Sequence, residues 1–429
     1  MKKKYRIILY TSIFLLCVVA SIILVVKKSN SVYEEESKPK VVKHKSMLSM
    51  NLEQTAGAGD YKTVTQSKWP TEGYKFNAEL SRCENGSTLS WDDTKKAVIV
   101  SGNLSDKCYV YFDIYQPTLA EYIKSQYTGT QGENNIYYHD SDLANGAGDN
   151  SYRYAGANPN NFVCFGTTES PCPTDNLYRI IGVFGENYHG VTGKQLVKLI
   201  KYDYMTTDEL GTDGDYSQTY KEWGMDSTYK GTYGDGERIG VYYWNYKATG
   251  SATNTWSTSL LNKTNLNTNF INNIGTTWAN KIATVTWKVG GNTWANIGTK
   301  TSSVAYTNEI TNPVTTNTTD NATTYSAKIG LMYVSDYGFA ASPDAWTLTM
   351  SSYNNTTATN NNWMYMGLYE WTISRNAVYS LNAFNVFYDG YVSGNDVGDY
   401  GGVRASFNLE SSVSYVSGSG SMSDPIVIN

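Results

Sequence analysis

Histidine is scarce in this sequence, which contains three histidines among 429 residues. His44 lies in a charged polar segment, and His139 and His189 lie in polar loop stretches. No Gly-x-Ser-x-Gly, His-Glu-x-x-His or Walker pattern accompanies them. The side chains needed for nucleophilic or zinc-dependent hydrolysis are therefore missing, and we expect a protein that is not an enzyme.

An excess of basic residues is also lacking. The net charge is −5, and the first 45 residues contain ten Lys and Arg against three acidic residues, so the remainder carries −12. Proteins that bind nucleic acid present a basic face to it. The composition therefore argues against nucleic acid as a partner.

Long apolar runs are limited to residues 7–26, which contain no charge. As a helix this run is about 30 Å long, the thickness of the hydrocarbon core of a bilayer. Basic residues precede it, which favours a cytoplasmic N-terminus. We predict a cytoplasmic tip and transmembrane signal anchor over residues 1–28, a single-pass location in the cell membrane, and an extracellular C-terminal bulk.

A cleaved signal peptide is the alternative interpretation of this segment. The run is longer than a usual signal-peptide core, and it ends in Val25-Val26-Lys27-Lys28 without a small-x-small site. No LPxTG-type sorting signal occurs at the end of the chain. We therefore expect the N-terminal helix to be retained and to provide the anchor.

Cysteine is rare, and its positions predict disulfides. Cys17 lies inside the apolar run and is interpreted as a membrane-buried thiol, whereas Cys83, Cys108, Cys164 and Cys172 form an even set. Adjacent pairing is the simplest of three connectivities, and it would remove about 3.5 and 2.6 kcal/mol of unfolded-state entropy. Zinc binding is the alternative, but no Cys-x-x-Cys occurs and no histidine lies at ligand spacing. No metal and no cofactor is predicted.

The rest of the chain divides by composition. Residues 29–60 have little apolar periodicity, which predicts a flexible stalk. Short strands between turn-rich pieces predict a small β module over residues 61–116. A helix that begins near Pro117 opens a connector, rich in loops, over residues 117–176. Its acidic and amide residues could hold calcium, but the EF-hand spacing is absent and a solvated polar loop is favoured; these residues are Asp140, Asp142, Asp149 and Asn150.

A second domain is expected over residues 177–429. Residues 178–184 and 195–202 are predicted to form strands. The second alternates apolar and polar residues, which predicts a half-buried strand. Residues 290–325 are dominated by Thr, Asn and Gly, which predicts little core. Residues 386–392 place an Asp-Gly pair between aromatic and β-branched residues, the strongest short-range indication of a hairpin.

Several segments of this domain form a recognisable set. They are Tyr178-Arg179-Ile180-Ile181-Gly182, Trp256 with Ser259-Leu260, residues 329–338, Glu370-Trp371-Thr372-Ile373-Ser374-Arg375, and Gly402-Val403-Arg404. The set resembles a widespread family of uncharacterised surface proteins of gut bacteria. That family is similar to the C-type-lectin-like fold of the formylglycine-generating enzyme superfamily, in which a Glu-Trp-Thr element and a late Gly-Phe-Arg element recur. Relatives usually continue with Pro, whereas Ala405 stands here.

The resemblance implies a fold class and no reaction. The implied class is α+β, mostly β, with an N-terminal transmembrane helix, a small β module and a C-type-lectin-like or formylglycine-generating-enzyme-like domain. Formylglycine-generating enzymes act through a cysteine pair in this domain, but no cysteine follows Cys172. The Glu-Pro-Asn, Gln-Pro-Asp and Trp-Asn-Asp triplets of calcium-dependent lectins are absent as well. We therefore expect neither chemistry.

Glu370 and Arg404 are predicted to meet in the core as a structural ion pair, because each stands in one of the two recurring elements. Together with Glu309 and Asp344, Glu370 is also a candidate for acid and base catalysis. Two carboxylates about 5 to 9 Å apart in a cleft would support a polysaccharide-active enzyme as the alternative function.

Aromatic and amide residues are abundant, with 37 Tyr and 11 Trp. Tyr offers rigid amphipathic area and Asn offers adaptable hydrogen bonds, a combination typical of binding surfaces. The predicted ligand-binding residues are Trp363, Tyr365, Tyr379, Asn382, Asn385, Tyr388, Tyr391, Asn395 and Asp396. We expect a membrane-anchored extracellular adhesin or receptor for a glycan or protein. The alternatives are ordinary sheet packing of these residues, the enzyme, and a self-assembling envelope subunit.

Overall fold

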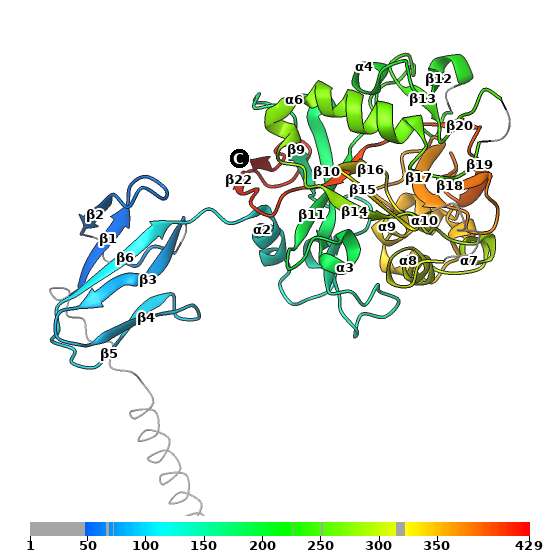
Figure 1. Ribbon diagram of the computed structural model, residues 1–429. Coiled ribbons are helices and arrows are strands. Elements are labelled where there is room, and N and C mark those ends of the chain that lie inside the picture. The colour runs from blue at the N-terminus through cyan, green and yellow to red at the C-terminus, as the bar shows by residue number, and fades with distance from the viewer. Residues whose placement is uncertain (1–47, 66–67, 72, 225, 250–251, 315–321) are drawn as a thin grey trace, which may run out of the picture. The chain divides into compact units, whose positions relative to one another are not determined.

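The computed structural model describes residues 48–65, 68–71, 73–224, 226–249, 252–314 and 322–429. The chain forms two compact units, which divide between Tyr115 and Gln116 (Figure 1). Strands hold 33% of the described residues and helices 21%, so this part of the protein is mostly β.

The predicted transmembrane helix requires a correction. In the described part of the chain, no helix is long and apolar enough to cross a membrane. The run at residues 7–26 lies outside the described residues. The predicted fold class with a spanning N-terminal helix, and the single-pass membrane location with an extracellular bulk, are therefore not supported. Both predictions depended on the length of one uncharged run, which does not by itself establish a spanning helix.

The first unit contains a four-stranded sheet with the order β2-β1-β6-β3, in which β1 and β6 run parallel. β4 and β5 form a separate hairpin. Met50, Leu52, Val110 and Phe112 form the buried core. The strands are β1 (Leu48–Glu53), β2 (Tyr61–Val64), β3 (Tyr74–Cys83), β4 (Thr88–Asp92), β5 (Ala97–Ser101) and β6 (Cys108–Ile114).

The stalk predicted over residues 29–60 is wrong for the part that the structure describes. β1 lies inside that range, and its side chains Met50 and Leu52 are buried against β6. The alternation of Leu48, Met50 and Leu52 is the period of a strand, but it is short and follows a charged segment.

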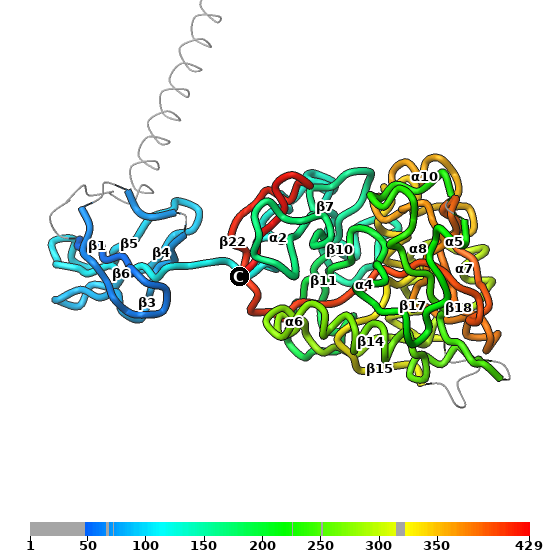
Figure 2. Tube along the Cα trace, turned by 90° about the horizontal axis from the view of Figure 1, so that it is seen from above, coloured from blue at the N-terminus to red at the C-terminus, as the bar shows by residue number. Residues whose placement is uncertain are grey.

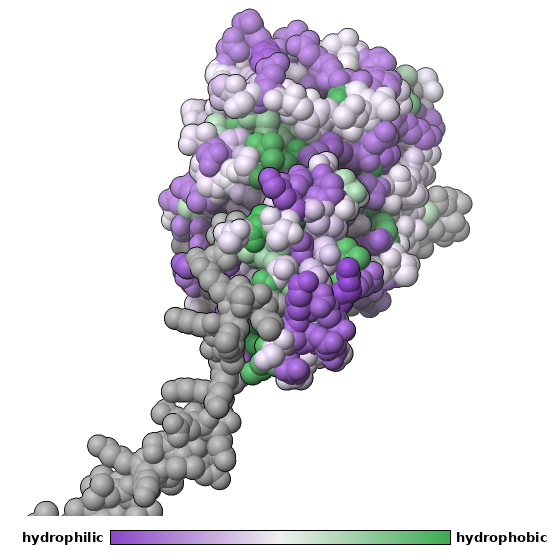
Figure 3. Space-filling model, turned by 90° about the vertical axis from the view of Figure 1, so that its left-hand side faces the viewer, coloured by the Kyte–Doolittle hydropathy of each residue, from purple (hydrophilic) through white to green (hydrophobic). Residues whose placement is uncertain are grey.

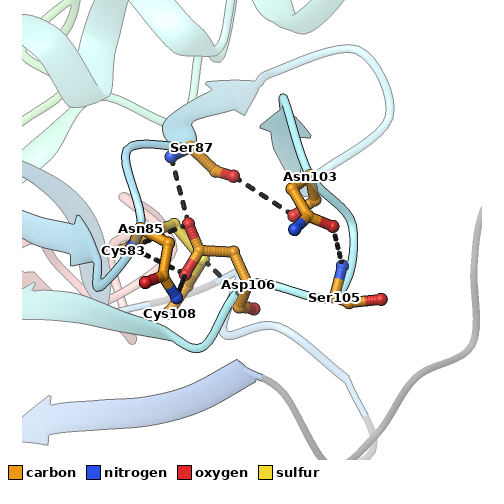
Figure 4. Close-up of a disulfide and its surroundings, with 7 residues drawn as sticks. All are labelled: Cys83, Asn85, Ser87, Asn103, Ser105, Asp106 and Cys108. Atoms are coloured by element: carbon orange, nitrogen blue, oxygen red, sulfur yellow. Dashed lines mark hydrogen bonds between the residues drawn. A yellow bond between two sulfur atoms is a disulfide. The ribbon is translucent and has the colours of Figure 1, made fainter.

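The two predicted disulfides are confirmed, Cys83 with Cys108 and Cys164 with Cys172. Figure 4 shows the first, with the Asp106 carboxylate beside it. This carboxylate accepts hydrogen bonds from the backbone N–H of Asn85 at 2.9 Å and of Ser87 at 3.1 Å. The disulfide and the carboxylate therefore tie the loop after β3 to the start of β6.

The second unit is built on a seven-stranded sheet. Six of its strands follow the order β16-β21-β11-β10-β8-β7, and the seventh, β9, pairs with β10. Every residue of β10 and β11 is buried. The prediction of a half-buried strand at residues 195–202 is therefore wrong. Lys198 and Lys201 are buried there because the carboxylates of Asp336 and Glu209 pair with them. The strands are β7 (Ile136–His139), β8 (Ser151–Tyr154), β9 (Phe162–Cys164), β10 (Leu177–Phe184), β11 (Leu196–Lys201), β16 (Ile329–Gly330) and β21 (Ser406–Asn408).

The predicted connector at residues 117–176 is part of this second unit, because β7, β8 and β9 belong to its central sheet. The second domain therefore begins at Gln116 and not at residue 177. Short strands such as Ser151–Tyr154 are hard to recognise between runs of Gly, Asn and Asp, which predict loops.

Four smaller sheets complete the second unit: β12-β13-β20, β17-β18-β19, β14-β15 and β22-β23. A bridge between Glu370 and Gly402 places the first two of these sheets side by side. Figures 1 and 2 both show β17 and β18 at the end of the unit far from β22. The strands are β12 (Tyr216–Thr219), β13 (Gly240–Tyr243), β14 (Val285–Lys288), β15 (Thr324–Ala327), β17 (Glu370–Arg375), β18 (Asn382–Val386), β19 (Val392–Asp396), β20 (Tyr400–Gly401), β22 (Tyr415–Ser417) and β23 (Val427–Ile428).

Short helices cover the sheets. The α-helices are α2 (Leu119–Ser125), α3 (Glu186–His189), α4 (Thr207–Leu210), α5 (Tyr220–Trp223), α6 (Ile271–Ala279), α7 (Trp294–Gly298), α8 (Ser302–Tyr306), α9 (Val334–Ala340) and α10 (Thr356–Asn360). The π-helical segments are η3 (Leu261–Phe270) and η4 (Thr307–Thr311), and the 3-10 turns are η1 (Glu133–Asn135), η2 (Thr174–Asn176), η5 (Pro343–Ala345) and η6 (Met350–Ser352). The face of the molecule in Figure 3 is mostly polar, and strongly apolar residues form only small patches on it.

Candidate ligand-binding face

The structure does not bring the predicted ligand-binding residues together on one surface. Trp363 and Tyr365 are core residues, with 3% and 6% of their surface exposed. The Trp363 indole N–H donates to the Tyr154 carbonyl at 2.8 Å, and the Tyr365 hydroxyl donates to the Tyr388 carbonyl at 2.6 Å. Their prediction as ligand contacts is therefore corrected to core packing.

Of the remaining predicted residues, Asn385 is buried within β18, and the others lie at two ends of the hairpin β18–β19. Tyr388 and Tyr391 are partly exposed in the turn between these strands. Tyr379, 60% exposed, lies in the loop before β18, near the other end of the strand. Asn382 pairs with Asp396 there, and Asn395 pairs with Ala383. A strand of five residues is about 17 Å long, so the two groups are separate.

A different set of aromatic side chains forms a continuous, partly exposed surface, which we call the aromatic face. Its members are Trp223, Tyr243, Tyr246, Tyr369, Phe387, Tyr388, Tyr391 and Tyr400. Each ring lies near the next one. The centroid distances are 4.4 Å for Tyr243–Tyr246, 5.8 Å for Tyr243–Tyr400, 5.1 Å for Trp223–Tyr400, 5.2 Å for Trp223–Tyr369, 4.9 Å for Tyr369–Phe387, 5.4 Å for Tyr369–Tyr388 and 4.3 Å for Phe387–Tyr391.

Two neighbouring sheets and a short helix position these rings. Tyr243 of β13 pairs across the ladder with Tyr400 of β20. Trp223 ends α5, which the Thr219 side chain caps by accepting from the backbone N–H of Glu222. The predicted hairpin at Asp389-Gly390 holds Phe387 against Tyr391, because the backbone N–H of Phe387 donates to the carbonyl of Tyr391 at 2.9 Å.

Gly390 is required at this turn. Its φ is +102°, a conformation that favours glycine. A Cβ at this position would lie 2.7 Å from Cγ2 of Thr359. The turn therefore fixes the place of the three aromatic residues that surround it, Phe387, Tyr388 and Tyr391.

Carboxylates act on two tyrosines of the aromatic face. Burial raises the pKa of the Tyr369 hydroxyl, and Tyr388, Asp389 and Asp226 raise it further. Burial and then Asp389 raise the pKa of Tyr391 in the same way. Lys221, within α5, pairs with Glu237, and Lys230 donates to the Thr359 carbonyl. Lys247, which follows Tyr246, is exposed, so side chains of both charge signs lie close in sequence to the face.

Three buried side-chain atoms of the same hairpin have no hydrogen-bond partner. Asn385 is 1% exposed, and both its amide nitrogen and its amide oxygen are unpartnered. Oδ1 of Asp389 is buried and unpartnered as well. An unsatisfied buried polar group costs about 1 to 3 kcal/mol, so these two groups require an explanation.

The Glu370 and Arg404 side chains meet as an ion pair in the core. The guanidinium donates to the two carboxylate oxygens at 2.7 and 2.9 Å, and also to the Met364 carbonyl at 2.6 Å. Burial raises the pKa of Glu370, and the Arg404 guanidinium opposes this effect. The pair links β17 to the segment before β21, which is a structural role.

The other candidate carboxylates lie in different environments. Glu309 is buried and accepts hydrogen bonds from the backbone N–H groups of Val334 and Ser335 and from the Ser374 hydroxyl. Burial raises its pKa to about 7. Asp344 is exposed in η5. The structure thus places Glu309 in a structural role at the start of α9.

The candidate calcium residues form turns and an ion pair. Asp149 pairs with Arg153 at 2.7 Å, and Asp140 accepts from the backbone N–H groups of Asp142 and Leu143. The Asn150 amide oxygen accepts from the Tyr138 hydroxyl. Within the described ranges, no group of three His, Cys, Asp or Glu residues could hold a metal ion.

Sequence reasoning missed six members of the aromatic face: Trp223, Tyr243, Tyr246, Tyr369, Phe387 and Tyr400. The prediction followed the local density of aromatic and amide residues, which is highest after residue 363. The aromatic face instead collects residues from positions 223 to 400. The strand pairing of β13 with β20 is what brings distant aromatic residues together.

Comparison of the chain with protein-family models, with curated proteins and with solved structures finds no match. The resemblance to C-type-lectin-like domains stays a prediction.

Proposed function

We propose that this protein is a non-enzymatic binding protein that holds a glycan or a protein ligand on its aromatic face. The observation that carries the proposal is the unbroken chain of ring contacts from Tyr246 to Tyr391 on side chains that are partly exposed. Exposed aromatic residues usually occur singly, and contiguous ones mark binding sites.

The chemistry of the aromatic face supports this role. Tyr and Trp rings supply a large apolar area with few rotatable bonds, so little conformational entropy is lost when a ligand binds. The mutual packing of the rings restricts them further. Binding energy at such surfaces concentrates in a few central aromatic residues, which here are Trp223, Tyr369 and Tyr400.

The test is a binding screen of the full-length chain against a glycan array and a protein panel. We expect at least one ligand, and we expect Trp223→Ala and Tyr369→Ala each to weaken its binding by about tenfold or more, which corresponds to about 1.4 kcal/mol. Tyr246→Ala, at the end of the face, should have a smaller effect.

Tyr138→Ala is the matched control. Tyr138 is partly exposed and stacks on Tyr152 at 4.6 Å, but it lies on β7 in the central sheet. Its replacement should leave binding unchanged. The proposal is wrong if neither ligand class binds, or if the face variants bind as the control does.

A further inference from the structure

A lysine and an aspartate meet in the core of the second unit. Lys198 lies on β11 and Asp336 lies on α9, and Nζ of the lysine is 2.6 Å from Oδ2 of the aspartate. Among the described residues, this is the one ion pair in which a lysine and its carboxylate are both fully buried. We propose that these two side chains become joined by an intramolecular amide bond, a covalent cross-link between β11 and α9.

Hydrogen bonds hold the two reacting groups against each other. The Tyr188 hydroxyl donates to Oδ1 of Asp336 at 2.6 Å and accepts from Nζ of Lys198 at 2.6 Å. The backbone N–H of Tyr333 donates to Oδ2 of Asp336 at 2.9 Å. Reacting groups held in this way reach effective concentrations of about 10⁵ to 10⁸ M. Amide formation, which is slow between an amine and a carboxyl group free in solution, is therefore favoured at this place.

The surroundings of the lysine favour its neutral, nucleophilic form. Burial lowers the pKa of Lys198, the Asp336 carboxylate opposes this effect, and the Arg153 guanidinium lowers the pKa further. A lysine amine becomes a nucleophile when it is desolvated beside another cation. Three aromatic rings also surround Nζ and exclude water from it. Their centroids lie 4.4, 4.8 and 5.0 Å from Nζ, and the rings belong to Tyr333, Tyr188 and Trp287.

A buried donor without a hydrogen-bond partner lies beside the carboxyl group. Nη1 of Arg153 is unpartnered and lies 4.0 Å from Oδ1 of Asp336. When Nζ attacks Cγ of Asp336, negative charge develops on Oδ1. A shift of about 1 Å brings Nη1 within hydrogen-bond distance of this oxygen, to which the Tyr188 hydroxyl already donates. Two donors aimed at a developing oxyanion stabilise a tetrahedral intermediate.

The reaction balances without a co-reactant. One proton passes from the Lys198 ammonium to Oδ2 of Asp336, which leaves an amine and a carboxylic acid. Nζ then attacks Cγ, so that a C–N bond forms and the bond between Cγ and Oδ2 breaks. A second proton from Nζ leaves with Oδ2 as water, and Nζ keeps one proton in the amide.

Burial favours the product over the ion pair. The amide is neutral, so the desolvation penalty of two buried charges disappears. The water that is released moves from an apolar core to the solvent. Tyr188, which contacts both reacting groups, also lines a surface pocket through which this water can leave. The cross-link closes a chain segment of 138 residues, which restricts the unfolded chain.

The neighbouring pair of Lys201 and Glu209 provides an internal comparison. Lys201 is buried, but the Glu209 side chain is 14% exposed. Its second carboxylate oxygen caps α4 by accepting from the backbone N–H of Thr206 at 2.8 Å. Solvent hydrates this carboxylate and stabilises its charge. We therefore expect this pair to remain ionic.

Mass spectrometry of the purified full-length chain under denaturing conditions tests the proposal, because unfolding separates an ion pair and leaves an amide intact. We expect a mass lower than that of the disulfide-bonded sequence by one water molecule. Trypsin should not cleave after an acylated lysine, so the digest should contain a branched peptide that joins Lys198 to Asp336. This measurement needs no variant and does not depend on the folding of one.

Variants assign the cross-link to its residues. Lys198→Met and Asp336→Leu should each restore the mass of the lost water, whereas the control Lys201→Met should keep the loss. Tyr188→Phe should slow the reaction and give a mixture of the two masses in freshly made protein. A folded, unaltered chain with its full mass and no branched peptide would overturn the proposal. Loss of water that persists in Lys198→Met would overturn it as well.

Discussion

Two buried arginines, Arg404 and Arg375, differ in whether a carboxylate compensates their charge. Arg404 pairs with Glu370, whereas Nη1 and Nη2 of Arg375 are unpartnered and only its Nε donates, to the Val289 carbonyl at 2.8 Å. Burial lowers the pKa of Arg375 to about 10. In the described part of the chain, no carboxylate forms an ion pair with Arg375.

Because of this difference, we expect substitutions of Arg404 and Arg375 to change the free energy of unfolding by different amounts. Arg404→Met leaves the Glu370 carboxylate buried without its counter-charge and should lower the free energy of unfolding by about 3 to 5 kcal/mol. Arg375→Met removes an unpaired charge and should cost much less, or should stabilise the protein. Urea unfolding of the two variants measures this contrast. Equal losses of stability would contradict the described environments.

Glu309 should make stability depend on pH. Its pKa is raised from 4.5 to about 7 by burial, so the folded protein holds this proton over a pH range in which the unfolded chain has released it. The contribution of Glu309 to the free energy of unfolding is therefore greatest below about pH 4.5 and falls as the pH rises through 7.

Glu309→Gln should remove this pH dependence, since glutamine does not titrate. The free energy of unfolding of the unmodified protein should fall between pH 5 and pH 8 by an amount on the order of 2 to 3 kcal/mol more than that of the variant. Urea titrations at the two pH values measure both differences. The same pH dependence in both proteins would show that the Glu309 pKa is not raised.

At the scale of elements, the hairpin turn couples stability to binding. Gly390→Ala should lower the free energy of unfolding by about 1 to 3 kcal/mol, because alanine is strained at a φ of +102° and its Cβ meets Thr359. The shift of Phe387 and Tyr391 should also weaken ligand binding. Gly86→Ala is the control, with a φ of +85° and open space around its Cβ. Gly86→Ala should lower the free energy of unfolding by less than Gly390→Ala and should leave ligand binding intact. Loss of binding in both variants would contradict the link between the turn and binding.

Sequence patterns predicted those elements whose signals are local. The Asp-Gly hairpin and the strand at Leu177–Phe184 were found because turn chemistry and apolar runs are encoded in adjacent residues. The full burial of β11 was not predicted, because Lys198 and Lys201 are typical of a strand with one face exposed to solvent. Both lysines are buried because each pairs with a carboxylate. Those partners, Asp336 and Glu209, come from other segments. Residues 290–325 likewise supply core residues such as Ile297 and Tyr306, although their composition is polar.

At the scale of the whole molecule, the two units should respond separately to loss of a disulfide. Cys83→Ala with Cys108→Ala removes the bond inside the first unit and should lower the stability of that unit by about 2 to 5 kcal/mol. Calorimetry should show one transition at a lower temperature and another unchanged. Ligand binding, which belongs to the second unit, should persist at low temperature. Loss of binding would contradict the division at Tyr115.

The aromatic face is a property of the whole fold, and this limits its prediction from the sequence. A Tyr-rich composition indicated a binding protein, and Tyr388 and Tyr391 were among the residues predicted for the site. Trp363 and Tyr365 come from the same dense stretch, yet they are buried beside Tyr154 and Tyr388. Exposure depends on which strands pair, and Tyr243 with Tyr400 are brought together only by the pairing of β13 with β20.

The central claim is that the aromatic face holds the ligand. A crystal structure of the full-length chain with the tightest-binding ligand of the binding screen tests it most directly. We predict ligand atoms in van der Waals contact, about 4 Å, with Tyr369, Phe387 or Tyr400. A ligand bound elsewhere on the protein, with these rings still open to solvent, would contradict the claim.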